Sequence, residues 1–374
     1  MPNTNLQYGD LIQFQEAIFY FRQKVQIPTD TWRDLQGMIH SKAFTVAGAN
    51  KTQLLNDFNQ AIDKAITSGE TITQFRKRFD EIVKDHGWSY KGKRGWRTHV
   101  IYQNNKNTAR AAGRWQQQER LKQRRPYLMY LTAGDLRVRP EHGSWHKIVL
   151  HIDHEFWFSH YPPNGWGCRC KVVSLNSRDI KRLNVKITDQ DKLIDVVTVD
   201  EKTGGLTGID LGWDYNPGKA WLGPDIVLGK SLIEMPANIR DIAIPEFNKS
   251  ILKSKPHYIN VVNEIAAKVA LDKFKDDQKV FTLGYIASEE ITKLLNKAKP
   301  ILNSLITISS AEIASLLKSG VRLEVLTQLM NTLHDANLYK YRNGMLEIMD
   351  TDIKVKISEP FNTITISNVF YSKF

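Results

Sequence analysis

The sequence has few of the residues that build covalent cross-links or membrane-spanning structure. It contains two cysteines among 374 residues, Cys168 and Cys170. Cysteines at i and i+2 form a strained disulfide, so we expect reduced thiols or metal ligands, as in proteins made in a reducing compartment. No apolar run approaches the roughly 20 residues that span a bilayer. The N-terminus, MPNTNLQYGD, lacks the basic-then-apolar pattern of a secretory signal. We therefore expect a protein with no membrane partner, kept on the cytoplasmic side.

Several catalytic motifs are also absent. The sequence has no GxSxG nucleophile elbow, no HExxH zinc-protease motif and no CxxC pair. The sequence therefore lacks the strong local signals for a serine hydrolase or a zinc site, and catalysis by residues that only the fold brings together stays open.

Positive charge is concentrated in one stretch of the chain. The formal net charge is +12, and residues 76–125 hold 15 Lys and Arg against 4 Asp and Glu, which leaves +11 in this window. Such an excess attracts nucleic acid or an acidic protein surface. The alternative is a solvated basic helix face that binds nothing specific. The candidate nucleic-acid-binding residues are Arg110, Arg114, Arg120, Lys122, Arg124 and Arg125.

The distribution of helical and strand-like patterns predicts an α+β fold in several parts. We expect a helical region over 1–125, a small α+β domain over 126–225, a linker over 226–245 and a C-terminal α+β module over 246–374. The chain is long enough for two or three domains with their own cores.

Apolar spacing predicts the individual elements of the first 125 residues. Helices are expected over 11–25, around Trp32–Ile39, over 51–67, after Thr71 and from about Thr98 to Leu121. The pair Thr71 and Gln74 resembles a capping box. Further on, strands are expected near 127–131, 148–152 and 169–173, and 204–222 is predicted as a loop. In the C-terminal module, helices are expected near 257–270, 288–297 and 310–318, and strands near 345–349, 353–357 and 363–369.

Two segments hold most of the chemically distinctive residues, Asp135–His142 and Tyr161–Lys171. Five of the ten histidines fall between His142 and His160, close in sequence to both cysteines. These nitrogen and sulfur atoms could form a tetrahedral zinc site, although the spacing matches no common zinc motif. The other interpretation is that the thiols and imidazoles only form hydrogen bonds in the core and loops. The candidate ligands are His142, His146, Cys168 and Cys170.

Three arginines in these segments are predicted to be structural. A guanidinium group holds a carboxylate at two points, and Asp135, Glu141 and Asp153 are nearby in the sequence. We expect Arg137, Arg139 and Arg169 to fasten the proline-containing loop to the rest of the domain in this way.

The same two segments resemble the phage Mu protein F-like head morphogenesis domain. The residues that carry the resemblance are RVRPEHGSWH followed by YPPNGWGCRCK, with Arg137, Arg139, Glu141, His142, Pro162, Pro163, Cys168, Arg169 and Cys170 as the motif. EAIFYFRQK at Glu16–Lys24, FTVAG at Phe44–Gly48, IYQNN at Ile101–Asn105 and GWDYNPGKAW at Gly212–Trp221 are also similar. The resemblance covers roughly residues 10–225.

This resemblance implies a minor head protein of a tailed phage or prophage. Its partners would be portal or coat proteins and packaged DNA. Its location would be the bacterial cytoplasm during assembly and then the virion head. No cofactor is implied, apart from the zinc site considered above.

The C-terminal residues 281–374 are similar in outline to the small nucleases that end some proteins of this family, of the barnase/EndoU/colicin/RelE-like class. That class usually needs a histidine pair in its second helix. The comparable segment, Ser310–Ser319, contains none. An inactive version is therefore favoured. The alternative is a toxin domain with ribonuclease activity, in which His334 would be the acid or base and Lys340 and Arg342 would bind phosphate.

Overall fold

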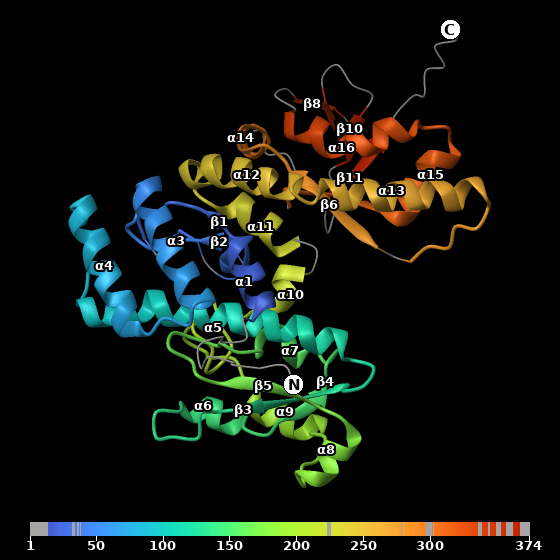
Figure 1. The fold of residues 1–374 in the computed structure, drawn as a ribbon. Coiled ribbons are helices and arrows are strands. Elements are labelled where there is room, and N and C mark those ends of the chain that lie inside the picture. Colours follow the sequence, from blue (N-terminus) through green and yellow to red (C-terminus); the bar gives the residue numbers. More distant parts are fainter. Residues whose placement is uncertain are drawn as a thin grey trace, which may run out of the picture. The chain divides into compact units, whose positions relative to one another are not determined.

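The computed structural model in Figure 1 describes most of the chain. The described residues are 14–31, 34, 35, 37, 39–222, 226–277, 279–296, 301, 303–335, 339–342, 345–348, 353–356 and 362–366; of 222, 226, 227, 335, 339, 340, 342 and 363–366 only the main chain is described. The chain forms two compact units, Met1–Gly223 and Pro224–Phe374. Half of the predicted helix around Trp32, the start of the helix expected over 11–25 and the ends of three predicted strands lie outside the described residues.

Four helices form the helical part of the first unit. Apolar side chains at helical spacing explain the first three, whereas the fourth and longest buries small and polar residues, such as Thr98 and Gln118, together with a few large apolar ones. Thr71 and Gln74 form the predicted capping box, and Gly87 ends that helix with a positive φ of 56°. The helix predicted from Thr98 begins earlier, at Arg94. The elements are α1 (Gln15–Arg22), α3 (Thr52–Thr67), α4 (Ile72–His86) and α5 (Arg94–Arg120).

The core of this helical part is rich in aromatic rings. Phe58, Phe75 and Phe79 are fully buried between α3, α4 and α5. A short parallel pair, β1 (Val25–Gln26) with β2 (Ala43–Phe44), and helix α2 (Ile39–Lys42) lie beside it.

Part of the predicted loop 204–222 is helical. Its last six residues form α10 (Pro217–Leu222), and the Trp221 ring packs against Phe19 and Tyr20 of α1. The burial of this tryptophan explains why the end of the segment is ordered as a helix.

A three-stranded antiparallel sheet forms the second part of the unit, in the order β4-β3-β5. Its strands are β3 (Tyr127–Leu131), β4 (Val149–His151) and β5 (Lys171–Leu175); the short helices are α6 (Pro140–Ser144), α7 (Phe156–Ser159), α8 (Ser177–Arg182) and α9 (Gln190–Val196). The strands predicted near these positions are confirmed. However, β5 begins at Lys171, because the residues before it belong to the loop that carries the cysteines.

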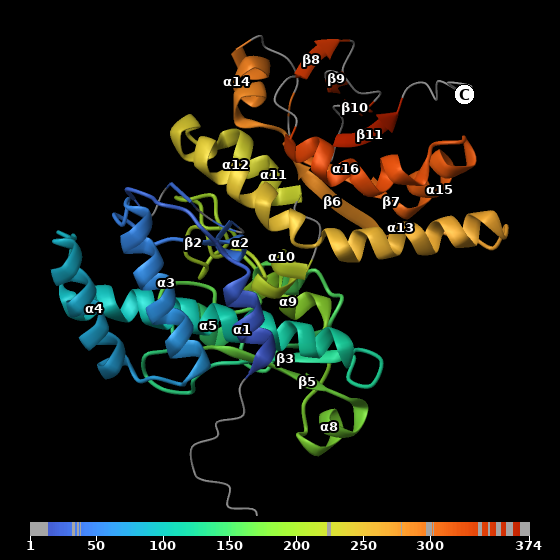
Figure 2. The ribbon, with the colours of Figure 1, turned by 45° about the horizontal axis from the view of Figure 1, so that its top comes forward.

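Helix α5 belongs to both parts of the first unit, and in Figures 1 and 2 it runs between the other helices and the sheet. Its Ile101, Tyr102 and Ala109 are in the helical core, whereas its Trp115 is in the core under the sheet with Tyr130 and Trp145. The Gln118 amide also donates to the carbonyl of Val172 at 3.2 Å. Helix α5 therefore holds the sheet and the helical part together.

The second unit contains a six-stranded sheet in the order β6-β7-β11-β10-β9-β8, in which only β7 and β11 pair in parallel. Its helices are α11 (Ile226–Glu234), α12 (Ala237–Leu252), α13 (Lys255–Ala270), α14 (Ser288–Asn296), α15 (Ser310–Lys318) and α16 (Leu323–Asp335). Its strands are β6 (Val280–Tyr285), β7 (Leu305–Ser309), β8 (Tyr339–Arg342), β9 (Met345–Ile348), β10 (Ile353–Lys356) and β11 (Asn362–Ile366).

The prediction of a linker over 226–245 is wrong. Helix α11 and much of α12 occupy this stretch, because Leu232, Ala243 and Ile244 are buried in the second unit. Neither proline prevents helix formation: Pro236 is the N-cap of α12, and Pro245 is accommodated inside it. The division of the first unit at residue 125 stays a prediction.

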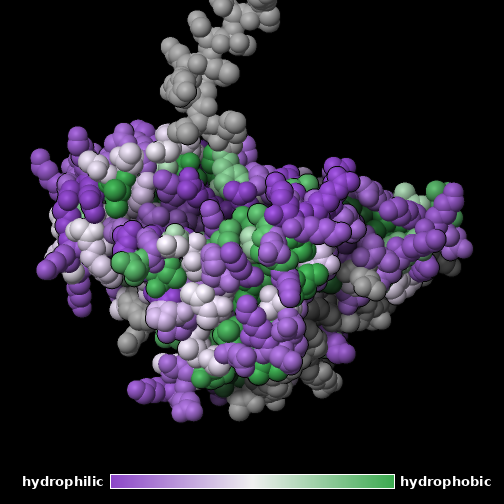
Figure 3. Space-filling model, turned by 90° about the horizontal axis from the view of Figure 1, so that it is seen from below, coloured by the Kyte–Doolittle hydropathy of each residue, from purple (hydrophilic) through white to green (hydrophobic). Residues whose placement is uncertain are grey.

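The α+β fold class is confirmed. Across the described ranges no helix has the length and apolar character needed to cross a membrane. The face in Figure 3 is mostly hydrophilic, and its hydrophobic residues lie in small separate groups.

Candidate functional site

The loop Tyr161–Cys170 is fastened to the rest of the first unit by a carboxylate far away in the sequence. Asp210 accepts two hydrogen bonds from the Arg139 guanidinium, at 2.8 and 2.9 Å, and one from the main-chain nitrogen of Trp166 at 2.7 Å. Arg139 also donates to the carbonyl of Trp166 at 3.2 Å. Asp210 raises the pKa of Arg139 through these bonds. The expectation that Arg139 would hold a carboxylate is correct, but the partner is Asp210 and neither Glu141 nor Asp153.

Gly165 is required for the close approach of these groups. A Cβ atom at this position would lie 2.4 Å from the Asp210 Oδ2 atom and 2.6 Å from the Arg139 Nη1 atom. Only glycine leaves room for the ion pair against the main chain of the loop. The neighbouring Asn164 is fully buried; its Oδ1 atom accepts from the Tyr130 hydroxyl at 3.0 Å, and its amide donates to the Ser159 carbonyl at 2.9 Å.

A second arginine–carboxylate pair connects the two motif segments. Arg169 donates to both oxygens of Asp135 at 2.6 Å, and Arg137 donates to the same carboxylate at 3.4 Å. These guanidinium groups, Arg169 first, hold the pKa of Asp135 well below its usual range. Arg137 and Arg169 therefore both donate hydrogen bonds to Asp135, which is one of the carboxylates that the sequence offered them.

His142 and both cysteines come together in one cluster. The Nδ1 atom of His142 lies 3.8 Å from the Cys168 Sγ atom and 3.5 Å from the Cys170 Sγ atom. One nitrogen and two sulfur ligand atoms thus lie within 4.8 Å of one another. The interaction between the two sulfurs lowers the pKa of Cys168 and raises that of Cys170. Both cysteines are free thiols.

His146, the fourth candidate ligand, does not join this cluster. Its Nδ1 atom instead accepts a hydrogen bond from the main-chain nitrogen of Thr132 at 3.2 Å and lies 3.0 Å from the Thr132 hydroxyl. His142 and His146 are one helical turn apart in sequence, but α6 ends between them at Ser144, so their side chains take different directions.

A groove of about 610 Å³ joins the motif loop to the basic helix α5. Arg110 and Arg114 line it from α5, and Arg169 and Lys171 line it from the other side, together with Pro162, Pro163 and both cysteines. Arg110 and Arg114 are exposed and form no ion pair within the described part of the chain. The groove therefore presents positive charge beside the proline loop.

Three of the other predicted nucleic-acid-binding residues are paired with carboxylates. Arg120 pairs with Glu16, Lys122 with Asp153 at 2.6 Å, and Arg125 with Asp179 at 2.6 Å. Arg124 is exposed without such a pair in the described residues. The free positive charge of the set is thus concentrated on Arg110, Arg114 and Arg124, which sequence patterns could not distinguish from the rest.

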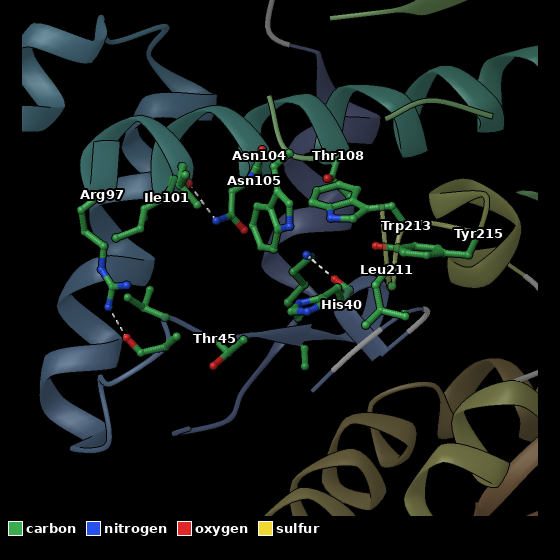
Figure 4. Close-up of a pocket in the computed structure, with 18 of the residues that line it drawn as sticks. His40, Thr45, Arg97, Ile101, Asn104, Asn105, Thr108, Leu211, Trp213 and Tyr215 are labelled. Carbon is green, nitrogen blue, oxygen red and sulfur yellow. Dashed lines mark hydrogen bonds between the residues drawn. The ribbon is translucent and has the colours of Figure 1, made fainter. Parts of the chain in front are cut away.

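A separate apolar pocket of about 380 Å³ is lined in part by other residues of α5 (Figure 4). Ile101, Asn104 and Thr108 of α5 line it, with Trp213 and Tyr215 opposite. The buried Arg97 Nε and Asn104 Nδ2 atoms have no hydrogen-bond partner among the described residues. The pocket also holds Lys24, whose Nζ atom donates to the His40 carbonyl at 2.5 Å and whose pKa is lowered by burial to about 7. Residues of the stretches Glu16–Lys24, Phe44–Gly48, Ile101–Asn105 and Gly212–Trp221, which carry part of the family resemblance, line this pocket, but their patterns did not predict that they form one.

The residues of the proposed nuclease site are described only in part. His334 lies in the last turn of α16. Lys340 and Arg342 lie in β8, but their side chains are outside the described residues. Whether the three side chains come together is therefore not tested, and their catalytic role stays a prediction.

The family model for Phage Mu protein F like protein matches residues 56–173. This chain contains a Mu protein F-like domain. The matched range runs from α3 through the basic helix and the proline loop to β5, so it includes every residue of the predicted motif. The resemblance recognised in the sequence is confirmed. No solved structure gives a significant match.

Two relatives are similar over much of the chain. "Putative capsid assembly protein F" of Escherichia phage Mu is 31% identical over 281 residues, with 66% of this chain and 64% of the relative covered. The Mu-like prophage FluMu F protein of Haemophilus influenzae is 28% identical over 303 residues, with 73% of each chain covered. The chain thus spans just under two thirds of the length of the Mu protein.

The second alignment reaches into the C-terminal unit. It covers 73% of this chain, whereas residues 1–225 make up only 60% of it. Part of the second unit therefore has a counterpart in the FluMu protein. No comparison supports a nuclease there.

Proposed function

We propose that this chain is a minor head protein that acts in the assembly of a phage or prophage head. The observation that carries the proposal is the Mu protein F-like domain at residues 56–173, within a longer similarity to a protein named for capsid assembly. The reach of the FluMu alignment beyond residue 225 supports one assembly protein over an assembly domain joined to an unrelated effector.

A finer proposal concerns the surface that contacts the other head components. We infer that the groove between α5 and the proline loop faces packaged DNA during assembly, near the portal. Arg110 and Arg114 line this groove and support the inference, because they are exposed cations without carboxylate partners in the described chain. Arg124 follows α5 and is an exposed cation of the same kind, although it does not line the groove. Such residues can bind the phosphate backbone of duplex DNA without contacting the bases.

The role in assembly is tested by following the chain in particles. A tagged copy is expressed from the phage or prophage that encodes it, and heads and head precursors are separated by sedimentation. We expect the chain in head precursors or finished heads. A chain found only in the unassembled fraction, while heads form normally, contradicts the proposal.

The DNA contact is tested by measuring duplex affinity of the full chain at several salt concentrations. Neutralising three phosphate contacts lowers the salt slope by about 3, because each contact releases about one counterion. We expect this reduction in the triple variant Arg110→Gln, Arg114→Gln, Arg124→Gln. The control, Arg120→Gln with Lys122→Gln, removes paired cations and is expected to change the slope much less. Equal slopes for wild type and the triple variant contradict the DNA contact and leave the assembly role intact.

A further inference from the structure

We propose that His142, Cys168 and Cys170 bind one Zn²⁺ ion, which ties the Cys168–Cys170 segment to helix α6. This inference is independent of the proposed head-assembly function. It rests on the arrangement of three side chains from two segments that are 26 residues apart.

The distances fit a tetrahedral zinc ion. With Zn–S bonds of about 2.3 Å and Zn–N bonds of about 2.0 Å, a tetrahedral ion places its nitrogen and sulfur ligands about 3.6 Å apart. The corresponding distances here are 3.5 and 3.8 Å, from the His142 Nδ1 atom to the two Sγ atoms. Both nitrogen–sulfur distances therefore match those around a tetrahedral zinc ion, and the two sulfurs lie within 4.8 Å of each other.

The histidine is held in the tautomer and orientation that a metal ligand needs. Its Nε2 atom lies 2.8 Å from the carbonyl oxygen of Gly208, and a carbonyl can only accept. The proton is therefore on Nε2 in the neutral ring, and the lone pair of Nδ1 points to the two sulfurs. A main-chain carbonyl on the second nitrogen is the usual support of a metal-binding histidine. The His142 ring is also buried and stacked on Trp145, with ring centres 4.9 Å apart.

The cluster leaves space for a fourth ligand. His142, Cys168 and Cys170 form part of the wall of a cavity of about 110 Å³, which is large enough for a water molecule. Arg137, Arg139 and Arg169 line the same cavity. Two thiolates and one imidazole favour zinc over calcium or magnesium, which take oxygen ligands. Two thiolates also balance the charge of the ion, so that no unpaired charge is buried.

The test measures zinc in the full chain, purified under reducing conditions, loaded with zinc and dialysed. We expect one zinc per chain in wild type, and at least a tenfold loss of zinc affinity in each of Cys168→Ser, Cys170→Ser and His142→Gln. His146→Gln is the matched control, because His146 lies outside the cluster, and it is expected to keep one zinc.

A second readout needs no variant. Cobalt in place of zinc is expected to give the intense thiolate-to-cobalt absorption and the visible bands of a tetrahedral ion, and to protect both thiols from alkylation. Wild type that shows neither zinc binding nor these bands overturns the proposal, as does a Cys168–Cys170 disulfide that persists after purification under reducing conditions. Zinc retained equally by His142→Gln and His146→Gln also overturns it.

Discussion

The two parts of the first unit are stabilised in different ways. The helical part buries apolar rings at regular spacing, with Phe58, Phe75 and Phe79 at its centre. The loops around the sheet also cover buried tryptophans, but their positions depend on specific polar contacts, such as the one between Arg139 and Asp210. The stability that comes from buried apolar surface changes little when a side chain moves slightly. An arginine that donates two hydrogen bonds to one carboxylate holds both groups in one geometry. The regular part thus supplies stability, and the irregular part supplies the defined shape of the motif loop.

The largest expected effect is in the helical core. Phe58→Ala removes a fully buried ring and leaves a cavity, so the free energy of unfolding is expected to fall by about 3–5 kcal/mol. Phe19→Ala, whose residue is 55% exposed in α1, is the control and is expected to cost less than about 1.5 kcal/mol. Chemical denaturation of both variants checks this. Equal losses of unfolding free energy in the two variants would mean that Phe58 is not part of a core more tightly packed than the surroundings of Phe19.

The next largest change in unfolding free energy is expected when the aspartate of a partly buried arginine–aspartate pair is removed, in comparison with an exposed pair. Asp210→Ala leaves Arg139 and the Trp166 N–H without their acceptor, and we expect a loss of about 2 kcal/mol. Asp80→Ala removes an equally bidentate pair with Arg94, but both side chains are about half exposed, and we expect less than about 1 kcal/mol. Denaturation curves of the two variants measure the difference. A larger loss in Asp80→Ala would reverse the comparison.

A smaller effect is expected from two glycines in the loop region. Gly165→Ala pushes a methyl group into the Arg139–Asp210 pair and should cost about 1–3 kcal/mol. Gly143→Ala, in α6, has no atom within 4 Å of the added Cβ and should be neutral or slightly stabilising. Thermal unfolding of both variants checks the pair. A neutral Gly165→Ala would show that the loop can move away from Asp210 at no cost.

The last prediction concerns the pH dependence of stability. The pKa of Lys24 is about 7 in the folded chain and has its ordinary value of 10.5 in the unfolded chain. Between these pH values the unfolded chain binds more protons, so the stability of wild type is expected to rise with pH from about 7 towards 10.5. Lys24→Met should remove this contribution, whereas Lys84→Met, at an exposed position, should keep it. Unfolding measured at pH 7, 8 and 9 compares the three. Parallel pH profiles of wild type and Lys24→Met would exclude a buried neutral lysine.

The difference between the regularly packed helical part and the loops around the sheet also explains how much could be predicted from the sequence. Apolar spacing and one capping box predicted α3 and α4 because both signals are local. Asp135 was one of three candidate carboxylates for Arg169, and His142 was grouped with the cysteines, because all of these residues lie in or near the two motif segments. The Arg139–Asp210 pair and the Gly208 carbonyl beside His142 did not, because they join residues 71 and 66 positions apart. Helices α11 and α12 were not predicted, although Leu232, Ala243 and Ile244 are buried in the second unit.

The most direct test of the central claim removes this gene from the phage or prophage that encodes it. Heads are counted by electron microscopy after induction, with the full chain supplied from a plasmid as the control. The account predicts few or no DNA-filled heads without the chain and their return when it is supplied. Normal numbers of DNA-filled heads in its absence would contradict a role in head assembly.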